Sequence, residues 1–210
     1  MPSKKITVQI MSPGILEDDM IVLGDMLIKQ WKIPTHLPLL LTFGSFRHRV
    51  KVIPLSRSDG VRMSSGLARK MGIQPRSPLR LIYRPQSSTL QLGPLLGVLL
   101  SQDFPGNPER PFGQMTLFCR ELVNACSRQG VFVYFFTPNH IGNSASQVSG
   151  WVYGNGWKQT QLPAADVFYN RLNSRKLENK PSVQHFMKEV KSRYGSQFFN
   201  EKYLDKTEVF

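Results

Sequence analysis

Apolar and polar side chains alternate in short runs over the first ninety residues of the chain. Alternation with a period of two is typical of strands that bury one face. Two short helices are expected between these strands, one near Asp25–Trp31 and one capped by Ser64 and ended by Gly72. The predicted strands are Ile6–Ile10, Ile21–Leu23, Leu39–Phe43, Arg49–Ile53, Val61–Met63 and Leu79–Tyr83.

The same region contains an internal repeat. A shift of forty residues places Ile21–Leu55 on Val61–Leu95 without a gap, with seven identities in thirty-five positions and apolar residues opposite apolar ones. Such a repeat predicts a duplicated, closed β-barrel with pseudo-two-fold symmetry, because closure removes the edges of a sheet. The pattern resembles that of double-psi or cradle-loop barrels. The repeat places in equivalent buried sites the pairs Leu27 and Leu67, Ile33 and Ile73, and Leu41 and Leu81.

The pattern changes after Gly93-Pro94. Continuous apolar runs at Leu95–Leu100 and Val131–Phe136 flank an amphipathic helix that is opened by Pro111 and ended by Gly130, which predicts a βαβ unit with a parallel sheet. A hairpin around Gly154-Asn155-Gly156 follows. The remaining predicted elements are a strand at Asp166–Leu172, a helix at Ser182–Tyr194 and a strand at Gln197–Asn200. The chain is therefore expected to be a basic barrel followed by an α/β domain.

The net positive charge of the chain indicates a class of anionic partner but does not indicate a function. The chain has 27 Lys+Arg and 14 Asp+Glu, a net charge of +13, and residues 1–90 carry 14 and 5 of these. A balance of this kind attracts nucleic acid or another polyanion. On the barrel, either a solvated basic face or an anion footprint would be formed by Arg47, Arg49, Lys51, Arg69, Lys70, Arg80 and Arg84.

Several chemistries are disfavoured by the sequence. It contains no phosphate-binding loop, no dinucleotide-binding glycine motif, no zinc-protease motif and no membrane-length apolar run. The two cysteines, Cys119 and Cys126, fall seven residues apart in a helical pattern and are expected to stay reduced, as in the cytoplasm. No catalytic residue and no metal site are predicted, since Glu17-Asp18-Asp19 is interpreted as a solvated acidic loop rather than a cation site.

Two segments of the second half carry candidate binding groups. Asn170, Arg171 and Arg175 follow a predicted buried strand, and ligands of open α/β sheets bind at the carboxyl ends of strands. These residues would either grip a carboxylate or phosphate or cap the loop structurally. Trp151, Tyr153 and Trp157 gather on the hairpin, where they would either shield a sheet edge or dock a partner.

Several sequence segments of the second half resemble those of the YheC/YheD-type endospore coat-associated proteins. The resemblance covers about residues 92–210 and is weaker over the barrel. It is carried by Gly93-Pro94-Leu95-Leu96-Gly97-Val98-Leu99, Phe118-Cys119-Arg120-Glu121-Leu122, Val133-Tyr134-Phe135-Phe136-Thr137-Pro138, Asp166-Val167-Phe168-Tyr169-Asn170-Arg171-Leu172-Asn173-Ser174-Arg175-Lys176 and Asp205-Lys206-Thr207-Glu208-Val209.

The resemblance implies an ATP-grasp protein. After the basic barrel that the repeat predicts at 1–92, it implies a Rossmann-like pre-ATP-grasp domain at 93–204 and the start of an ATP-grasp module at 205–210, with Lys206 matching a lysine that contacts ATP phosphate. ATP and Mg are implied for the complete protein, a carboxylate–amine ligase-like enzyme, whereas this chain alone is expected to be non-catalytic. The alternatives are a polyanion-binding module and a structural protein that contacts spore-coat proteins.

Overall fold

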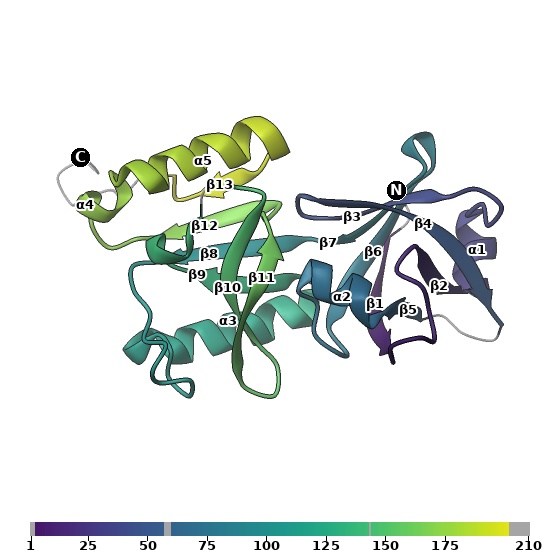
Figure 1. Cartoon of the computed structure of the whole chain (residues 1–210), viewed down its shortest axis with the longest axis horizontal. Helices are drawn as coiled ribbons and strands as arrows, with labels where there is room; N and C mark the ends of the chain where they lie inside the picture. The colour runs from purple at the N-terminus through teal and green to yellow at the C-terminus, as the bar shows by residue number, and fades with distance from the viewer. Residues whose placement is uncertain (1–2, 57–59, 143, 202–210) are drawn as a thin grey trace. The chain divides into compact units, whose positions relative to one another are not determined.

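The chain forms two compact units, which are described one at a time. The structure is a computed structural model that describes residues 3–56, 60–142 and 144–201 (Figure 1). The first unit contains the described residues of Met1–Pro94 together with Asn124–Phe132, and the second contains Leu95–Val123 and the described residues from Val133 onward. No helix among the described residues is long and apolar enough to cross a membrane.

The first unit is a closed barrel of seven strands, in the order β1-β5-β2-β4-β3-β7-β6. A closed, mixed barrel confirms the coarse prediction from the alternating runs. The strands are β1 (Ser3–Met11), β2 (Met20–Gly24), β3 (Leu39–Phe43), β4 (Phe46–Leu55), β5 (Val61–Ser64), β6 (Pro78–Arg84) and β7 (Thr89–Gly93).

Strand pairing interleaves the two halves of the barrel. β1 lies parallel to β5 and β2 lies parallel to β4, while β2 and β5 run antiparallel to each other between them. In the same way, β1 pairs antiparallel with β6 and β4 pairs antiparallel with β3. None of the three strands β1, β2 and β3 pairs with another of the three.

The strand β7 was missing from the sequence-based prediction. It lies between β3 and β6 and closes the barrel, with Leu90 and Leu92 fully buried. The forty-residue shift pairs these leucines with Val50 and Val52 of β4, but β4 is parallel to β2 whereas β7 is parallel to β3. The repeat therefore aligns β2 with β5, before the helices, and β3 with β6, after them. At its C-terminal end it aligns β4 with β7, which have different strand partners.

Two short helices follow β2 and β5 as expected. They are α1 (Asp25–Trp31) and α2 (Ser65–Met71), and the Ser64 side chain caps α2 by accepting a hydrogen bond from the Leu67 N–H. Gly72 ends α2 in the left-handed conformation at φ 69°, where glycine has no steric penalty. The core between helices and barrel includes all six residues that the repeat predicted to be buried: Leu27, Leu67, Ile33, Ile73, Leu41 and Leu81.

The second unit contains a six-stranded sheet in the order β11-β10-β9-β8-β12-β13. β12 is parallel to β8 and to β13, and β10 is antiparallel to β9 and β11. The strands are β8 (Leu95–Leu100), β9 (Phe132–Phe136), β10 (Gln147–Tyr153), β11 (Trp157–Pro163), β12 (Val167–Arg171) and β13 (Gln197–Phe199).

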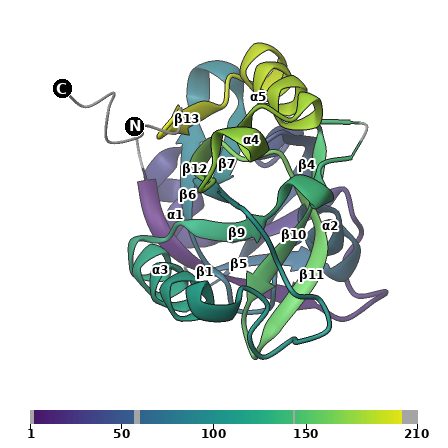
Figure 2. The same ribbon diagram turned by 90° about the vertical axis from the view of Figure 1, so that its left-hand side faces the viewer.

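Helices lie on both faces of this sheet, as Figures 1 and 2 show. They are α3 (Thr116–Gln129), α4 (Arg175–Glu178) and α5 (Pro181–Tyr194). Phe168 of β12 packs on Phe186 of α5, with ring centroids 5.3 Å apart, whereas Arg171 of the same strand lies over Phe118 of α3. Successive strand residues point to opposite faces, so α3 and α5 cover different sides of the sheet.

Most bounds in the second unit differ from the prediction by a residue or less, but two helices differ more. The helix expected from Pro111 begins at Thr116, because a short 3-10 turn at Gly113–Met115 precedes it and Gly113 has a positive φ of 55°. The one-turn helix α4 was not predicted, since four residues are too few to show a helical period.

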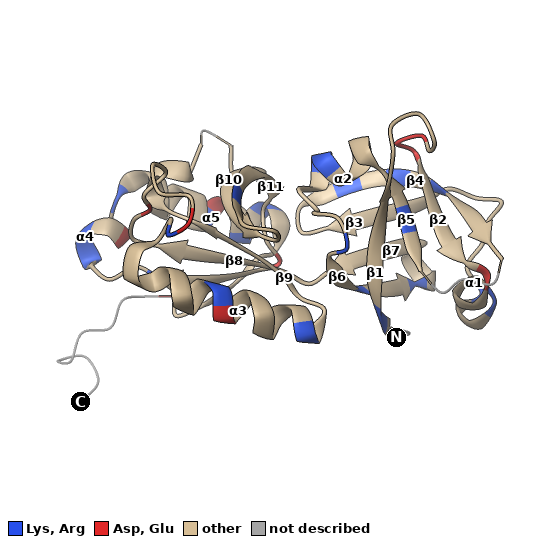
Figure 3. Cartoon of the chain, turned by 90° about the horizontal axis from the view of Figure 1, so that it is seen from below, with Lys and Arg blue, Asp and Glu red and all other residues tan. Residues whose placement is uncertain are grey.

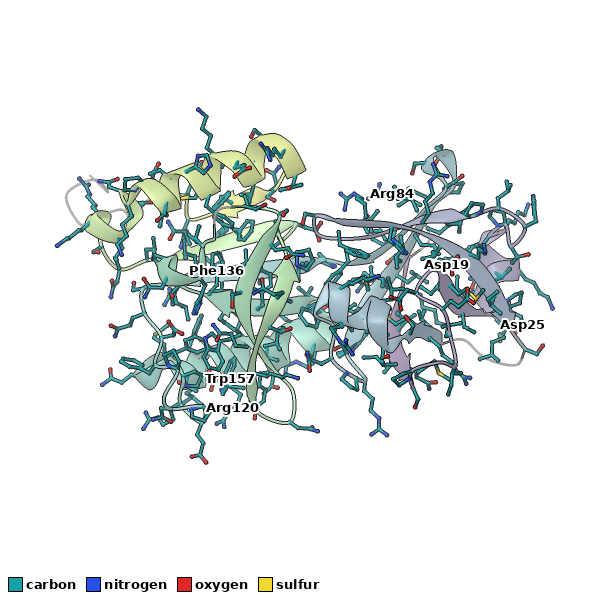
Figure 4. All side chains as sticks on the ribbon, viewed as in Figure 1. Asp19, Asp25, Arg84, Arg120, Phe136 and Trp157 are labelled. Atoms are coloured by element: carbon teal, nitrogen blue, oxygen red, sulfur yellow. The ribbon has the colours of Figure 1, made fainter. Side chains whose placement is uncertain are left out.

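Close packing requires a glycine at position 97. A Cβ built there would lie 2.7 Å from the ring of Phe168 and 3.1 Å from that of Tyr134. Phe168 also contacts Phe136 and Phe198, at ring-centroid distances of 5.8 and 5.2 Å. Figure 4 shows Phe136 inside this unit. The aromatic cluster is thus packed directly against the backbone of β8.

Candidate functional site

The carboxyl ends of β8 and β12 meet at one edge of the second sheet. Arg171 at the end of β12 pairs with Leu100 at the end of β8. Just beyond the two strands, the Ser101 hydroxyl donates to the Asn173 side chain at 2.8 Å and accepts from the Asn173 N–H at 3.0 Å. The parallel pairing of β8 with β12 therefore brings polar groups of two distant segments together.

Asn170 is buried at this edge and hydrogen-bonded on both sides of its amide. Its Nδ2 donates to Glu178 Oε1 at 3.1 Å, and its Oδ1 accepts from the Leu172 N–H at 3.1 Å. Both Asn170 and Glu178 are less than one tenth exposed. These contacts fix the turn that leads from β12 into α4. Asn170 therefore has a structural role at the carboxyl edge of the sheet.

Arg171 is exposed and points to the other face of the sheet. Its guanidinium lies 5.0 Å from the centre of the Phe118 ring and 5.5 Å from that of Tyr169, and it donates to the Tyr169 hydroxyl at 3.2 Å. Stacking of this kind orients a guanidinium and leaves donors for an anion. Arg175, the first residue of α4, is also exposed. Lys206, the residue implied for ATP, lies outside the described residues.

A buried carboxylate that the sequence analysis did not single out lies beyond β8. Asp103 Oδ2 accepts a hydrogen bond from Trp151 Nε1 at 3.0 Å and Oδ1 accepts one from the Thr137 hydroxyl at 3.2 Å, while His140 Nε2 lies 3.2 Å from Oδ2. Its side chain is only 4% exposed. Three separate segments are joined here through a single carboxylate, and no local sequence signal marks such a convergence.

The hydrogen bonds around His140 define its protonation state. Nδ1 accepts from the backbone N–H of Thr137 at 3.2 Å, so the proton of the neutral ring is on Nε2, which lies 3.0 Å from the side-chain amide of Gln159 and 3.2 Å from Asp103 Oδ2. Burial lowers the pKa of His140, although the Asp103 carboxylate opposes that shift. The imidazole is therefore held neutral, because a second proton would have to displace the Thr137 N–H.

Neither cysteine is arranged as a nucleophile. Both are free and buried, as their spacing predicted. Burial raises the pKa of the Cys119 thiol to about 12, with only partial compensation from the Arg171 charge. A thiol with so high a pKa is not ionised near neutral pH. Among the described residues, no group of three or more His, Cys, Asp or Glu side chains could hold a metal ion.

The acidic loop before β2 is held by ion pairs with the barrel. Asp18 accepts from the Ser64 hydroxyl at 2.6 Å and from Lys70 at 3.0 Å, while Asp19 lies 3.4 Å from Lys51. The Ser64 hydrogen bond, followed by that of Lys70, lowers the pKa of Asp18. A side chain at Gly66 would fall 2.3 Å from the Asp18 carboxylate, so the glycine allows this carboxylate to sit on α2.

The basic residues predicted on the barrel divide into two kinds. Arg47, Arg49 and Lys51 are exposed and alternate with inward-facing residues along β4, and blue segments mark β4 and α2 in Figure 3. Arg80 and Arg84 share the outer face of β6, as the spacing predicted, and are half-buried. Arg84 donates twice to Gln91 Oε1, at 3.1 and 2.9 Å. Arg69 is an exposed neighbour of Lys70 on α2.

The hairpin aromatics have separate environments. Trp151 is buried and bonded to Asp103, whereas Tyr153 and Trp157 are half-buried and lie opposite each other on β10 and β11. Trp151 thus belongs to the core, and only the other two rings are accessible at the hairpin end.

Barrel and α/β unit together define a two-unit protein that has a polar carboxyl edge on its second sheet. The particular relative found for the chain is the endospore coat-associated protein YheD of Bacillus subtilis (strain 168), which is 29% identical over 150 residues. This match confirms the resemblance to the YheC/YheD type. It covers 71% of this chain and 32% of the relative, so the chain matches about a third of YheD. No family model and no solved structure matches the chain.

Proposed function

We propose that this chain is a coat-associated protein of the YheC/YheD type whose second unit is the Rossmann-like, pre-ATP-grasp domain of a carboxylate–amine ligase-like protein. The similarity to YheD supports an association with the spore coat and with coat proteins as partners. In this proposal the chain is made in the cytoplasm and then becomes associated with the coat. The sheet supports the domain type. Four of its strands lie side by side in the order β9-β8-β12-β13. Numbered along the chain from β8, this is the order 2-1-3-4, which is typical of doubly wound folds with helices on both faces.

The carboxyl edge is the observation that carries the proposal. Ligands of doubly wound sheets bind where strands β8 and β12 end, and here that edge presents Ser101, Asn173 and the stacked guanidinium of Arg171. In the proposed site, Arg171 and Arg175 bind the carboxylate or phosphate of a substrate, and Asn170 positions the turn between them. Within the described part of the chain these groups bind and orient, and none of them is arranged as a nucleophile.

In the complete protein, ATP with Mg would supply the γ-phosphoryl group that activates the substrate carboxylate as an acyl phosphate, with ADP as the leaving group. Lys206 would pair with a phosphate of the nucleotide. One charge-assisted contact contributes at most about 1–3 kcal/mol, which is far short of micromolar affinity. The 210 residues by themselves are therefore proposed to be non-catalytic.

Calorimetry with ATP and Mg²⁺ tests this proposal. The 210-residue chain is expected to give no saturable heat, whereas a fusion of this chain to the part of YheD that it does not match is expected to bind ATP. Lys206→Ala should weaken binding by the fusion at least about tenfold, and Arg171→Ala should instead impair use of the carboxylate substrate.

Full-length YheD is the control for a fusion that does not fold. Saturable micromolar binding of ATP by the 210-residue chain would contradict the proposal, and so would a folded full-length YheD that binds no ATP.

The barrel is proposed to be a duplicated, double-psi-like domain. The support is the pairing of β1 with β5 and of β2 with β4, which are both parallel and flank the antiparallel β2–β5 pair. The two helices also follow corresponding strands, β2 and β5.

A second candidate function, polyanion binding, is favoured by the outward row Arg47, Arg49 and Lys51 on β4. Replacing all three by serine should reduce the affinity for heparin and flatten its salt dependence, because fewer counterions are released. The matched control replaces Lys158, Lys176 and Lys188 of the second unit by serine, which removes the same charge. Equal losses in the two triple variants would show that only net charge matters.

A further inference from the structure

A pocket of about 370 Å³ opens beside the hairpin of the second unit. It is lined by Pro108, Glu109, Arg120, Tyr153, Gly156 and Trp157. Its volume is near the lower end of the range for small-molecule sites, which is about 300–1,000 Å³. The lining comes from three elements: the loop after β8, helix α3 and the β10–β11 hairpin. The pocket lies apart from Asn170, which points to the α5 side of the sheet.

One wall of the pocket is an aromatic pair that is held in place from behind. Tyr153 and Trp157 are directly opposite on β10 and β11, with ring centroids 5.0 Å apart. The indole also contacts the rings of Phe112 and Phe135, at 5.2 and 5.6 Å, in edge-on geometry. Three ring contacts fix the orientation of Trp157, so little order is lost when a ligand packs on it.

The turn of the hairpin contributes Gly156 to the lining of the pocket. A Cβ on Gly156 would meet no atom within 4 Å, and its φ of 142° disfavours any larger residue. No side chain therefore fills the space next to Trp157 at the turn of the hairpin.

Two opposite charges face this pocket without neutralising each other. Glu109 and Arg120 are both exposed, and among the described residues neither side chain forms an ion pair or a hydrogen bond. Figure 4 labels Arg120 beside Trp157, and both line the same pocket. A carboxylate and a guanidinium that share one small pocket create an electric dipole across it.

Both charges are carried by ordered backbone. Arg120 belongs to the second turn of α3. The loop that carries Glu109 is closed by hydrogen bonds from Phe104 N to Pro111 O at 2.7 Å and from Arg110 N to Asn107 Oδ1 at 3.1 Å. The fold thus sets the backbone positions from which the two side chains reach the pocket.

We propose that this pocket binds a small zwitterion, an α-amino acid with an aromatic side chain. Its carboxylate pairs with the Arg120 guanidinium, its ammonium pairs with Glu109, and its side chain packs on Trp157 and Tyr153. Guanidinium suits a carboxylate because it offers parallel donors, and an ammonium near a carboxylate and an indole gains both ion pairing and cation–π attraction. The proposal does not depend on ATP-grasp activity, because the pocket is complete within the second unit.

An NMR titration of the 210-residue chain with L-phenylalanine tests the site. The indole N–H signal of Trp157, assigned with Trp157→Phe, is expected to shift saturably. The analogues 3-phenylpropionate, which lacks the ammonium, and phenethylamine, which lacks the carboxylate, should each bind about tenfold more weakly or worse.

Variants connect each charge to its partner. Arg120→Gln should weaken binding of phenylalanine and phenylpropionate but not of phenethylamine, and Glu109→Gln should weaken phenylalanine and phenethylamine but not phenylpropionate. Glu121→Gln, which changes an exposed neighbour of Arg120 on α3, and Lys188→Gln on α5 are the matched controls and should bind like the parent chain.

Absence of a saturable shift with L-phenylalanine would overturn the proposal. It would also be overturned if both analogues bound as well as phenylalanine, or if the control variants lost as much affinity as the pocket variants. None of these results depends on ATP binding, so failure here and failure of the proposed function are distinguishable.

Discussion

Replacing Phe168 by alanine is expected to lower the free energy of unfolding of the second unit by about 3–5 kcal/mol. The side chain is fully buried and touches the rings of Phe136, Phe186 and Phe198. Its removal deletes apolar burial and leaves a cavity that the sheet on one side and α5 on the other cannot close. Urea unfolding monitored by circular dichroism measures the change.

Phe199→Ala is the matched control, because that ring is 60% exposed on the edge strand β13. Its loss is expected to cost less than about 1 kcal/mol. Similar shifts for the two variants would show that the aromatic cluster is not the core of the unit.

Asp103→Ala is expected to destabilise the same unit by about 3 kcal/mol or more. The substitution leaves two donors without their acceptor, the Trp151 indole N–H and the Thr137 hydroxyl, and removes the carboxylate that lies 3.2 Å from His140 Nε2. Each unsatisfied buried donor costs about 1–3 kcal/mol. Glu121→Ala, at an exposed position of α3, is the control and should change stability by less than about 0.5 kcal/mol.

The pH dependence of stability provides a second readout of this cluster. Because the pKa of His140 is lowered from 6.5 in the folded chain, the unfolded chain binds the proton first as the pH falls. Stability from this residue is complete above pH 6.5 and declines as the pH drops toward the folded pKa. His140→Asn should show a shallower decline over that interval, and an unchanged slope would contradict the assignment of a neutral, buried imidazole.

The barrel strands were predictable where burial on one face imposes a period of two. Leu39–Phe43 of the barrel has the bounds that the sequence predicted, and so has Leu95–Leu100 of the second sheet, which was predicted from its continuous apolar run. Ser64 and Gly72 mark the ends of α2 through local capping chemistry. β7 was missed because Thr89–Gly93 is short and its role depends on its neighbours β3 and β6, which are distant in sequence. Pairing between distant strands leaves no periodic signal in either strand alone.

The site was predictable only as a location. The rule that ligands bind at carboxyl ends of strands pointed to Asn170 and Arg171, but the alternation of strand residues sends these two side chains to opposite faces. Asp103 and the Glu109–Arg120 pair were missed because their partners come from separate loops and helices. Such convergence is a property of the folded chain, and single-sequence motifs do not contain it.

The interleaved strand order of the barrel has a consequence for its folding. Every strand partner of β1, β2 and β3 comes from residues 46–93, so a free fragment ending before β4 would contain none of the barrel's strand pairs. During synthesis, the first three strands therefore have to wait for the chain that follows them before any part of this sheet can form.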